Sequence, residues 1–309
     1  MVERLRHLLT LRLVQEIART GSVRKAGELM SITPSAVQRR LQLLEEELGQ
    51  PIFERLPNGM RLNPAGEVVL QHIRQQFAEV ERLRGSLAEL SGMRRGHVSI
   101  ACSQAVVSSF LPSEIVAYQA LYPDVTFNVE VLDHLAASAR LADFTADMAL
   151  VYDVSNPPDV DVVVTVPQRI YAVMGAGHPL AHRKTLRLDE CLAHPLALPN
   201  PRFGGRVLLN RALAASGRQI MPKIECNSFE FLKAMVASNN YLTFQIPIGA
   251  PVIAGSPIVT VPVDSRDIDA GNIYFRQLRG RTLPIAAQRF ADQITRSLST
   301  YEPVLAPGA

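Results

Sequence analysis

Apolar and polar positions in the first 62 residues repeat with the period of short helices, and a tight turn separates two of these helices. Residues 22–30 begin with Ser22 after a glycine, a position from which a serine side chain can cap a helix. Thr33 is a second possible helix cap, and the proline after it suits the first position of a helix. A second helix is predicted from there through Glu45. Two short helices joined by a tight turn predict a helix-turn-helix.

The second helix divides into an apolar face and a polar face at about 100° per residue. Four aliphatic residues share one arc and are expected to pack inward: Val37, Leu41, Leu44 and Leu48. A separate arc holds only polar or basic residues: Ser35, Gln38, Arg39 and Gln42. Hydroxyl, amide and guanidinium groups read base edges in a major groove, and Arg40, which lies off that arc, suits a phosphate contact. An ordinary solvated face is the alternative, and this helix alone does not decide between them.

A hairpin is predicted directly after this helix. Residues 52–55 and 60–62 are short extended pieces on either side of Asn58 and Gly59, a dipeptide that favours a two-residue β-turn. Arg55 and Arg61 flank the turn. A wing of this kind can carry them to phosphate or to a minor groove.

One long helix is predicted after the hairpin, starting at Asn63 and Pro64. Its apolar residues recur at spacings of 4, 3, 3, 4 and 3, which is close to a heptad pattern: Ile73, Phe77, Val80, Leu83, Leu87 and Leu90. A helix of about 28 residues would be about 40 Å long, which is too long for a domain of about 60 residues to cover. The stripe therefore indicates a dimerisation helix, with packing on its own C-terminal domain as the alternative.

From His97 onward, short β-branched segments alternate with helical ones, which predicts an α/β module with largely parallel sheets. The expected strands are 97–103, 125–132, 148–152, 161–166, 169–175, 241–246, 257–263 and 272–278. The expected helices are 108–123, 206–217, 228–239 and 284–300, with Gly217 closing the second of them.

Composition adds a charge asymmetry to this organisation. The 309 residues are 47% hydrophobic and 20% charged, which suits two or three units with buried cores. Residues 1–62 hold 10 basic and 7 acidic residues, and the remainder holds 22 of each, so the whole net charge of +3 lies in the first fifth. An excess there suits a small domain that meets phosphate.

The cellular setting is predicted from what the chain lacks. Charges interleave with leucines at the N-terminus, so we expect no signal peptide, and no apolar run reaches the roughly 18 to 20 residues of a membrane span. Cys102, Cys191 and Cys226 lie far apart, which fits reduced thiols. The sequence therefore predicts a cytoplasmic protein that does not associate with a membrane.

The run GSVRKAGELMSITPSAVQRRLQLLEEELGQPIFERLPNGMRLNPAG resembles the LysR-type DNA-binding domain over about 45 contiguous positions. The resemblance implies a winged helix-turn-helix, with base or phosphate contacts from Thr33, Ser35, Gln38 and Arg39 and wing contacts around Arg55 to Arg61. It also implies that the connecting helix pairs antiparallel with its copy, so that one dimer reads two half-sites on double-stranded DNA. Gln38 departs from the family, where many members have serine, and its amide could read adenine.

Residues 97–301 resemble the LysR effector module, which is related to periplasmic binding proteins and has two α/β lobes joined by two crossover strands. The matching landmarks are Ser103 with FLP at 110–112, DMAL at 147–150, HPLA at 178–181 and NSF at 227–229. Phe144 stands where the family often has glycine, and Asn239 and Asn240 sit in a usually glycine-rich turn. The predicted domains are a DNA-binding domain (1–62), a linker helix (63–92) and an effector domain (93–309), with lobe I at about 93–164 and 269–309 and lobe II at about 165–268.

The effector is expected between these two lobes. Ser103 and Ser228 are each expected just before a helix, where unpaired N–H groups and the helix dipole favour an anion. The resemblance places these serines on opposite walls of the cleft. The full set of candidate contacts is Ser103, Gln104, Asn200, Arg202, Ser228, Phe229 and Gln245. A small carboxylate is the hypothesis, and the alternative is that both serines only cap helices while Arg202 is solvated.

An enzyme is the rival class, and its motifs are incomplete in this chain. His178 and His182 have a proline between them and no third ligand at metal spacing, so we expect no metal site. Gly175 and Gly177 lack the third glycine of a dinucleotide fingerprint, and residues 203–206 lack the lysine of a P-loop. There is no GxSxG. We therefore expect no catalytic residue and no cofactor, and a regulator that binds DNA, a small molecule and a second copy of itself, as a dimer or tetramer.

Overall fold

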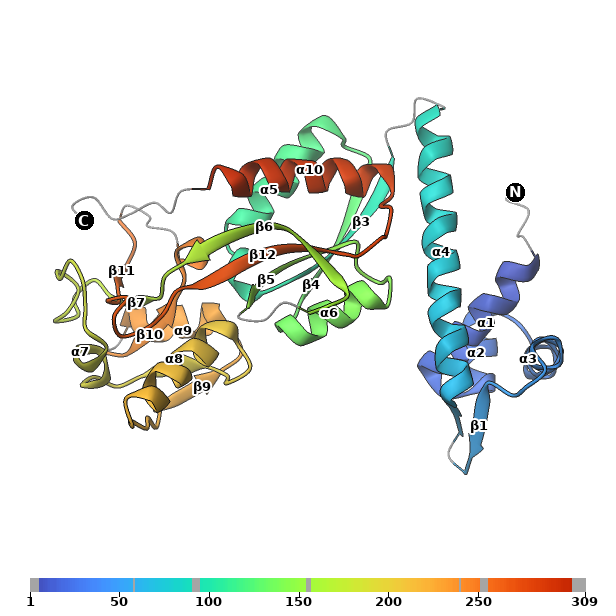
Figure 1. Ribbon diagram of the computed structural model, residues 1–309, viewed down its shortest axis with the longest axis horizontal. Coiled ribbons are helices and arrows are strands. Elements are labelled where there is room, and N and C mark those ends of the chain that lie inside the picture. The colour runs from blue at the N-terminus through green and yellow to red at the C-terminus, as the bar shows by residue number, and fades with distance from the viewer. Residues whose placement is uncertain are drawn as a thin grey trace. The chain divides into compact units, whose positions relative to one another are not determined.

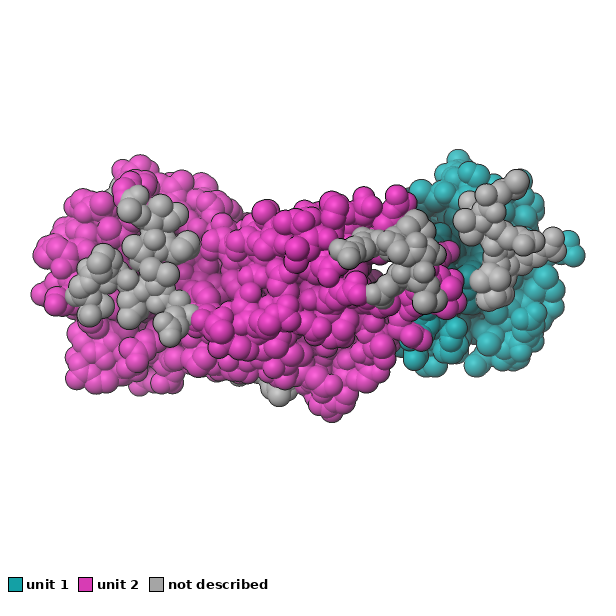
Figure 2. Space-filling view, turned by 90° about the horizontal axis from the view of Figure 1, so that it is seen from above, with its two compact units in different colours: residues 1–81 teal, residues 82–309 magenta. Residues whose placement is uncertain are grey.

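The computed structural model describes residues 6–57, 59–90, 95–153, 157–238, 240–250 and 255–301, and it divides into two compact units, residues 1–81 and 82–309 (Figure 2). The first unit holds three helices, a hairpin and most of a long fourth helix (Figure 1): α1 (Arg6–Thr20), α2 (Val23–Met30), α3 (Pro34–Leu48), β1 (Phe53–Leu56), β2 (Gly59–Leu62) and α4 (Pro64–Leu90). Its core joins α1, α3, the hairpin and α4 through Leu13, Ile17, Val37, Ile52 and Ile73.

Local capping signals begin two of these helices. The Ser22 hydroxyl accepts a hydrogen bond from the Lys25 N–H, as predicted for the start of α2. Asn63 starts α4 in the same way, because its Oδ1 accepts from the Gly66 N–H at 2.8 Å. Thr33 precedes α3, but its side chain makes no capping hydrogen bond, so this start rests on the proline that follows.

The predicted hairpin is confirmed, although Asn58 of its turn lies outside the described residues. Strands β1 and β2 pair antiparallel, with Glu54 opposite Arg61. Gly59 has φ of +138°, and a Cβ there would lie 2.4 Å from the Gly21 carbonyl oxygen, so this turn requires glycine. The Glu45 carboxylate accepts from the Ile52 N–H at 2.8 Å and ties the hairpin to the end of α3.

Helix α4 carries its apolar stripe beyond the first unit's core. Ile73 is buried in that core, and Phe77 packs against it with the Arg12 guanidinium 5.6 Å from its ring centroid. Leu83 and Leu87 remain 56% and 54% exposed. The first apolar residues of the stripe therefore pack within the first unit, whereas Leu83 and Leu87 are more than half exposed.

The second unit contains a five-stranded sheet in the order β4-β3-β5-β12-β6, which we call lobe I together with its helices. Its strands are β3 (Gly96–Cys102), β4 (Val125–Val131), β5 (Met148–Asp153), β6 (Val160–Gln168) and β12 (Gly271–Leu278). Helices α5 (Phe110–Leu121) and α10 (Ile285–Ser299) cover one face, and α6 (His134–Ala142) covers the other (Figure 1). Tyr118 and Phe290 fill the space beneath α5 and α10, with ring centroids 5.2 Å apart.

Lobe II is built on the strand order β10-β7-β11, extended by a bridge from β10 to the pair β8-β9. Its strands are β7 (Tyr171–Gly175), β8 (Ala197–Pro199), β9 (Ile224–Cys226), β10 (Leu242–Gln245) and β11 (Ile258–Pro262). Its helices are α7 (Leu188–Leu192), α8 (Gly204–Ala215) and α9 (Phe229–Ser238). Two 3₁₀ turns, η1 (Gln104–Val106) of lobe I and η2 (Pro247–Gly249) of lobe II, pack against each other.

The expectation of largely parallel sheets is wrong. Strand β3 is parallel to β4 and β5, and β8 is parallel to β9, but β12 is antiparallel to β5 and β6, and β7 is antiparallel to β10 and β11. The reason is the crossover between the lobes: β6 leads out of lobe I into β7, and β12 returns from lobe II and pairs along β6 (Figure 1). A chain that leaves and returns side by side forms an antiparallel pair.

Phe144 occupies the loop after α6 with φ of +58°, in the left-handed region that glycine adopts most readily. This explains why glycine suits the position. The Arg281 guanidinium lies 5.2 Å from the Phe144 ring centroid and pairs with Asp147 at 2.6 Å. Helix α6 itself was not predicted; Asp133 caps it by accepting from the Ala136 N–H at 2.9 Å.

Candidate DNA-binding and effector-binding sites

The polar face of α3 is solvent-accessible, as its sequence pattern predicts. Val37 and Leu41 are buried in the first unit's core, with Leu44 packed against it. Ser35 and Arg39 are exposed, and Gln38 and Arg40 are half-buried. Leu48 was expected to pack inward, but it is 42% exposed because it lies in the last turn, where the helix ends at Gly49 beyond the core.

Arg39 and Arg40 of α3 are not paired with acidic side chains among the described residues, so they can bind an external partner. Within the described part of the chain, neither Arg39 nor Arg40 forms an ion pair or a side-chain hydrogen bond, and Gln38 forms no side-chain hydrogen bond. Thr33 is exposed beside them, with its hydroxyl oxygen 3.4 Å from that of Ser35. Intramolecular partners therefore do not neutralise this end of the helix.

The wing carries two exposed arginines in different electrostatic settings. Arg61 pairs with Glu54 of the facing strand at 2.8 Å, and both side chains are exposed. Arg55 has no acidic partner among the described residues. The wing therefore presents one free positive charge and one that Glu54 partly compensates.

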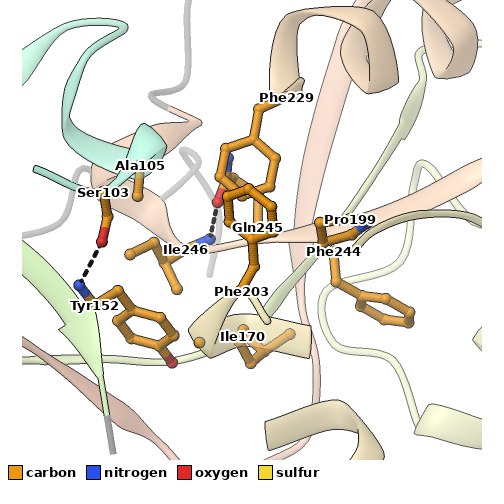
Figure 3. Close-up of a pocket in the computed structure, with 12 residues that line it drawn as sticks. Ser103, Ala105, Tyr152, Ile170, Pro199, Phe203, Phe229, Phe244, Gln245 and Ile246 are labelled. Carbon is orange, nitrogen blue, oxygen red and sulfur yellow. Dashed lines mark hydrogen bonds between the residues drawn. The ribbon is translucent and has the colours of Figure 1, made fainter. Parts of the chain in front are cut away.

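A small cavity lies between the lobes of the second unit (Figure 3). Strand ends, η1 and the starts of α8 and α9 form its walls: Ser103, Ala105, Tyr152, Ile170, Pro199, Phe203, Gly204, Gly205, Phe229, Phe244, Gln245 and Ile246. The structure thus brings together three of the predicted effector contacts, Ser103, Phe229 and Gln245. No charged side chain is among the residues that line it.

The other four predicted contacts have different positions. Asn200 accepts from the Phe203 N–H through its backbone carbonyl, and Arg202 is exposed. The Ser228 hydroxyl accepts from the Phe231 N–H at 3.3 Å and so caps α9, which is the alternative role named for it above. Gln104 lies outside the cavity lining and bridges the two lobes, as described below.

Ser103 lines the cavity for a reason that the sequence pattern did not contain. It was expected just before a helix, but only the three-residue turn η1 follows it, and α5 begins at Phe110. Its hydroxyl instead accepts from the Tyr152 N–H at 3.0 Å (Figure 3). No acceptor for its hydroxyl proton is found among the described residues, so the group can still donate to a ligand.

Gln245 faces the same cavity with an unused donor. The side chain is 7% exposed, and its Oε1 accepts from the neighbouring Ile246 N–H at 3.1 Å. Its Nε2 has no acceptor within the described part of the chain. The buried amide can therefore donate to a ligand in the cavity.

The start of α8 adds backbone donors that were not predicted. Gly204 and Gly205 line the cavity, and Phe203 before them provides no side-chain cap, so the first N–H groups of this helix have no partner among the described residues. A Cβ at Gly204 would lie 2.5 Å from the Tyr152 carbonyl oxygen, which explains glycine at this contact. The sequence signal was the Gly-Gly pair before an amphipathic helix, which was tested only as a P-loop.

Apolar rings form most of the remaining wall. The Phe203 and Phe229 rings have centroids 5.5 Å apart at an interplanar angle of 50°. The buried Arg206 faces elsewhere: it donates to the Pro199 carbonyl at 3.2 Å and pairs with Glu225 at 3.0 Å. The cavity therefore combines an apolar body with neutral hydrogen-bond donors.

No reactive thiol accompanies this cavity. Burial raises the pKa of Cys102 to about 12, and burial with the nearby Glu190 raises the pKa of Cys191 to about 12. Burial also raises the pKa of Tyr152, so its phenol stays protonated at neutral pH. With these raised pKa values, none of the three groups offers a nucleophile at neutral pH.

Two family comparisons match almost the whole chain. Residues 8–67 match the bacterial regulatory helix-turn-helix proteins of the lysR family, and residues 91–299 match the LysR substrate binding domain. The chain belongs to the LysR family. It is a DNA-binding transcriptional regulator with an effector-binding domain, as the sequence analysis predicted. None of the helices in the described ranges is long and apolar enough to cross a membrane.

Individual family members are distant in sequence. The transcriptional dual regulator GltC of Bacillus subtilis is 29% identical over 237 residues, covering 76% of this chain and 79% of that one. The transcriptional activator CmpR of Synechocystis is 22% identical over 283 residues, covering 90% and 91%. Full-length OxyR from Pseudomonas aeruginosa, as a single-residue variant, has a TM-score of 0.66 at 18% identity, covering 95% and 94%. Full-length CbnR in complex with its target DNA has a TM-score of 0.63 at 17% identity, covering 94% and 99%.

Proposed function

We propose that α3 reads an operator through Ser35, Gln38 and Arg39, with Thr33, Arg40, Arg55 and Arg61 contacting the DNA backbone. The observation that carries this proposal is the solvent-accessible polar face of α3. Buried aliphatic residues hold the helix from behind, and no acidic side chain neutralises Arg39 or Arg40 among the described residues. Side chains of these types supply base-edge and phosphate contacts in a major groove.

Substitution of Arg39 tests this assignment. Arg39→Ala is expected to weaken binding to an operator, selected from the source genome, by roughly 1–3 kcal/mol, with a smaller effect on unrelated DNA. Arg61→Ala is the control for a backbone contact and should weaken both duplexes alike. Unchanged operator affinity for Arg39→Ala at a fixed salt concentration would remove α3 as the reading element.

For the effector, we propose a small molecule with an acceptor-rich head, such as a carboxylate, and an apolar body. The unused polar groups around the cavity are donors: the Ser103 hydroxyl, the Gln245 amide and the first N–H groups of α8. Donors that converge at a helix N-terminus favour an anionic oxygen even without a cationic side chain. The Phe203 and Phe229 rings suit the apolar part.

A ligand screen on the full chain tests the effector proposal. Small carboxylates and their uncharged amides are compared by thermal shift, because a ligand stabilises the state that it binds. The best carboxylate should lose most of its shift in Ser103→Ala and Gln245→Ala, but not in the control Ser228→Ala, which removes a cap outside the cavity. Equal shifts in all three variants would place the site elsewhere.

The remaining parts of the proposal concern assembly and setting. We propose a homo-oligomer that pairs through the exposed end of the α4 stripe at Leu83 and Leu87. The neutral donors that line the cavity, and the raised pKa values of the buried Cys102 and Cys191 outside it, support a sensor rather than an enzyme. The two unpaired, buried thiols are compatible with the reducing cytoplasm, where we place the protein. Turnover of the bound effector would contradict the sensor assignment.

A further inference from the structure

One side chain joins the two lobes beside the cavity. Gln104 belongs to η1 of lobe I, and its carboxamide reaches the beginning of α9 in lobe II. Its Nε2 donates to the Asn227 carbonyl oxygen, and its Oε1 accepts from the Phe229 N–H at 2.8 Å. Phe229 is the first residue of α9, so this N–H has no partner within its own helix. Gln104 thus pairs both backbone groups from the opposite lobe.

A second junction between the lobes has a different character. The Ser108 hydroxyl donates to the Gly249 carbonyl at 3.2 Å, and the Ser109 hydroxyl donates to the Ile248 carbonyl at 3.3 Å. Backbone packing is also close there, since a Cβ on Gly249 would lie 2.9 Å from the Ala105 carbonyl oxygen. This junction does not depend on one side chain, whereas both hydrogen bonds at α9 come from Gln104.

The cavity between these junctions has little room for a ligand. Ser103 and Gln245, the proposed contacts, are both more than nine-tenths buried. The space between the side chains that line it could hold only a few water molecules. Entry of an effector therefore requires the lobes to separate, and the junction at α9 is the one that a single rotamer change can release.

We propose that Gln104 is an interlobe latch, which holds the cleft closed until an effector enters. This inference rests on the proposed effector function of the cavity. Gln104 lies outside the cavity lining, and the first N–H groups of α8 lie within it, so the latch and the proposed effector use different groups. Because the closed cavity has little room, the two latch hydrogen bonds must break before an effector binds, and loss of the latch raises the population of the open state that can bind it.

Interlobe distances in the ligand-free, full-length protein test the latch. Spin labels are placed at Val116→Cys on α5 and Met221→Cys in lobe II, both highly exposed, with Cys226→Ser to remove the half-buried thiol. We expect one main distance with Gln104 present. Gln104→Ala should shift the equilibrium toward longer distances by roughly tenfold or more, since two hydrogen bonds are lost.

Two further variants separate the latch from a general loss of structure. Gln104→Glu keeps an acceptor for the Phe229 N–H but sets a carboxylate against the Asn227 carbonyl, so it should also open the cleft. Gln119→Ala is the matched control, because the Gln119 amide bonds only within lobe I, to the Val125 carbonyl at 3.1 Å. Hydrogen exchange at the Phe229 amide should accelerate with opening in the Gln104 variants, while the middle of α9 stays protected.

The outcomes distinguish the latch from the effector proposal. Identical distance distributions and Phe229 exchange in Gln104→Ala and Gln119→Ala would overturn the latch, whatever the cavity binds. An open cleft in Gln104→Ala supports it even if no carboxylate in the screen stabilises the protein, a result that would count only against the proposed effector chemistry.

Discussion

At the scale of single residues, His178 shows how burial makes a side chain sensitive to pH. Its side chain is 4% exposed, its Nδ1 accepts from the Leu180 N–H at 3.2 Å, and its Nε2 is buried without a hydrogen-bond partner in the described residues. Burial lowers the pKa of His178. The neighbouring His194, whose ring centroid lies 4.5 Å from that of His178, lowers this pKa further. The folded protein therefore favours the neutral imidazole.

The sign of the pH effect follows from this lowered pKa. Between the folded pKa and the unfolded value of about 6.5, the unfolded chain binds more protons, so stability falls as pH drops through this range. His178→Asn keeps an acceptor near the position of Nδ1 for the Leu180 N–H and should reduce the loss of Tm between about pH 7 and pH 5. The exposed His182→Asn is the control. An equal acid-induced loss in both variants would show that His178 does not cause it.

Phe144 offers a second test at this scale, because its φ of +58° is costly for any residue with a Cβ. Phe144→Ala and Phe144→Gly both remove the ring beside Arg281, but only glycine relieves the backbone strain. Phe144→Gly is therefore expected to be more stable than Phe144→Ala by about 1 kcal/mol in urea unfolding. Equal stability of the two variants would mean that the backbone is unstrained there.

At the scale of elements, the wing contains a charge pair that we expect to weaken DNA binding. Glu54 holds Arg61 across the hairpin at 2.8 Å, and both side chains are exposed, so the pair adds little stability. Glu54→Gln should release Arg61 from this ion pair. It also removes a carboxylate that the DNA phosphates would repel. We expect roughly two- to fivefold tighter binding at low salt, alike for operator and unrelated DNA, and a steeper salt dependence.

The matched control for the wing is Glu130→Gln. It breaks an exposed Glu–Arg pair of similar geometry, with Arg140, in the effector unit. DNA affinity should not change in this variant. Equal affinity of wild type and Glu54→Gln across salt concentrations would place Arg61 away from the DNA.

Helix α4 carries two kinds of apolar position that look alike in the sequence. Phe77 packs on the first unit's core, so a charge there would unfold that unit and would not report on assembly. Leu83 and Leu87 are exposed, and Leu83→Asp with Leu87→Asp should raise the dissociation constant of the oligomer by at least about tenfold, because unpaired charges are costly to bury. Light scattering on the full chain measures this, with Met221→Asp as the exposed control. An unchanged mass at micromolar concentration would show that Leu83 and Leu87 do not form the oligomer contact.

At the scale of the whole molecule, local signals were read correctly and distant contacts were not. The Ser22 and Asn63 caps, the hairpin and helices α5, α8, α9 and α10 follow from neighbouring residues, and the structure places them within a few residues of the predicted bounds. Strand direction depends on how the chain crosses between the lobes, and no short pattern encodes that path. The parallel-sheet prediction failed for this reason.

The candidate effector site shows the same division. Ser103 and Gln245 were predicted as effector contacts and do line the cavity, but the Ser103 hydroxyl accepts from the Tyr152 N–H, which lies 49 positions later in the chain. Gly204 was overlooked because its role depends on close approach to the Tyr152 carbonyl. Arg202 was also among the predicted contacts, yet it is exposed and lies outside the cavity lining.

Separate cores in the two units lead to a prediction about unfolding. Val37 is buried in the core of the first unit, and Phe290 is buried in the main core of the second. Calorimetry of the full chain should therefore show two transitions rather than one. Val37→Ala should lower the transition of the first unit, and Phe290→Ala, at a cost of about 3–5 kcal/mol, should lower that of the second. An effector should raise only the transition that Phe290→Ala lowers. A single transition that both variants shift equally would mean that α4, which runs through both units, couples them into one cooperative structure.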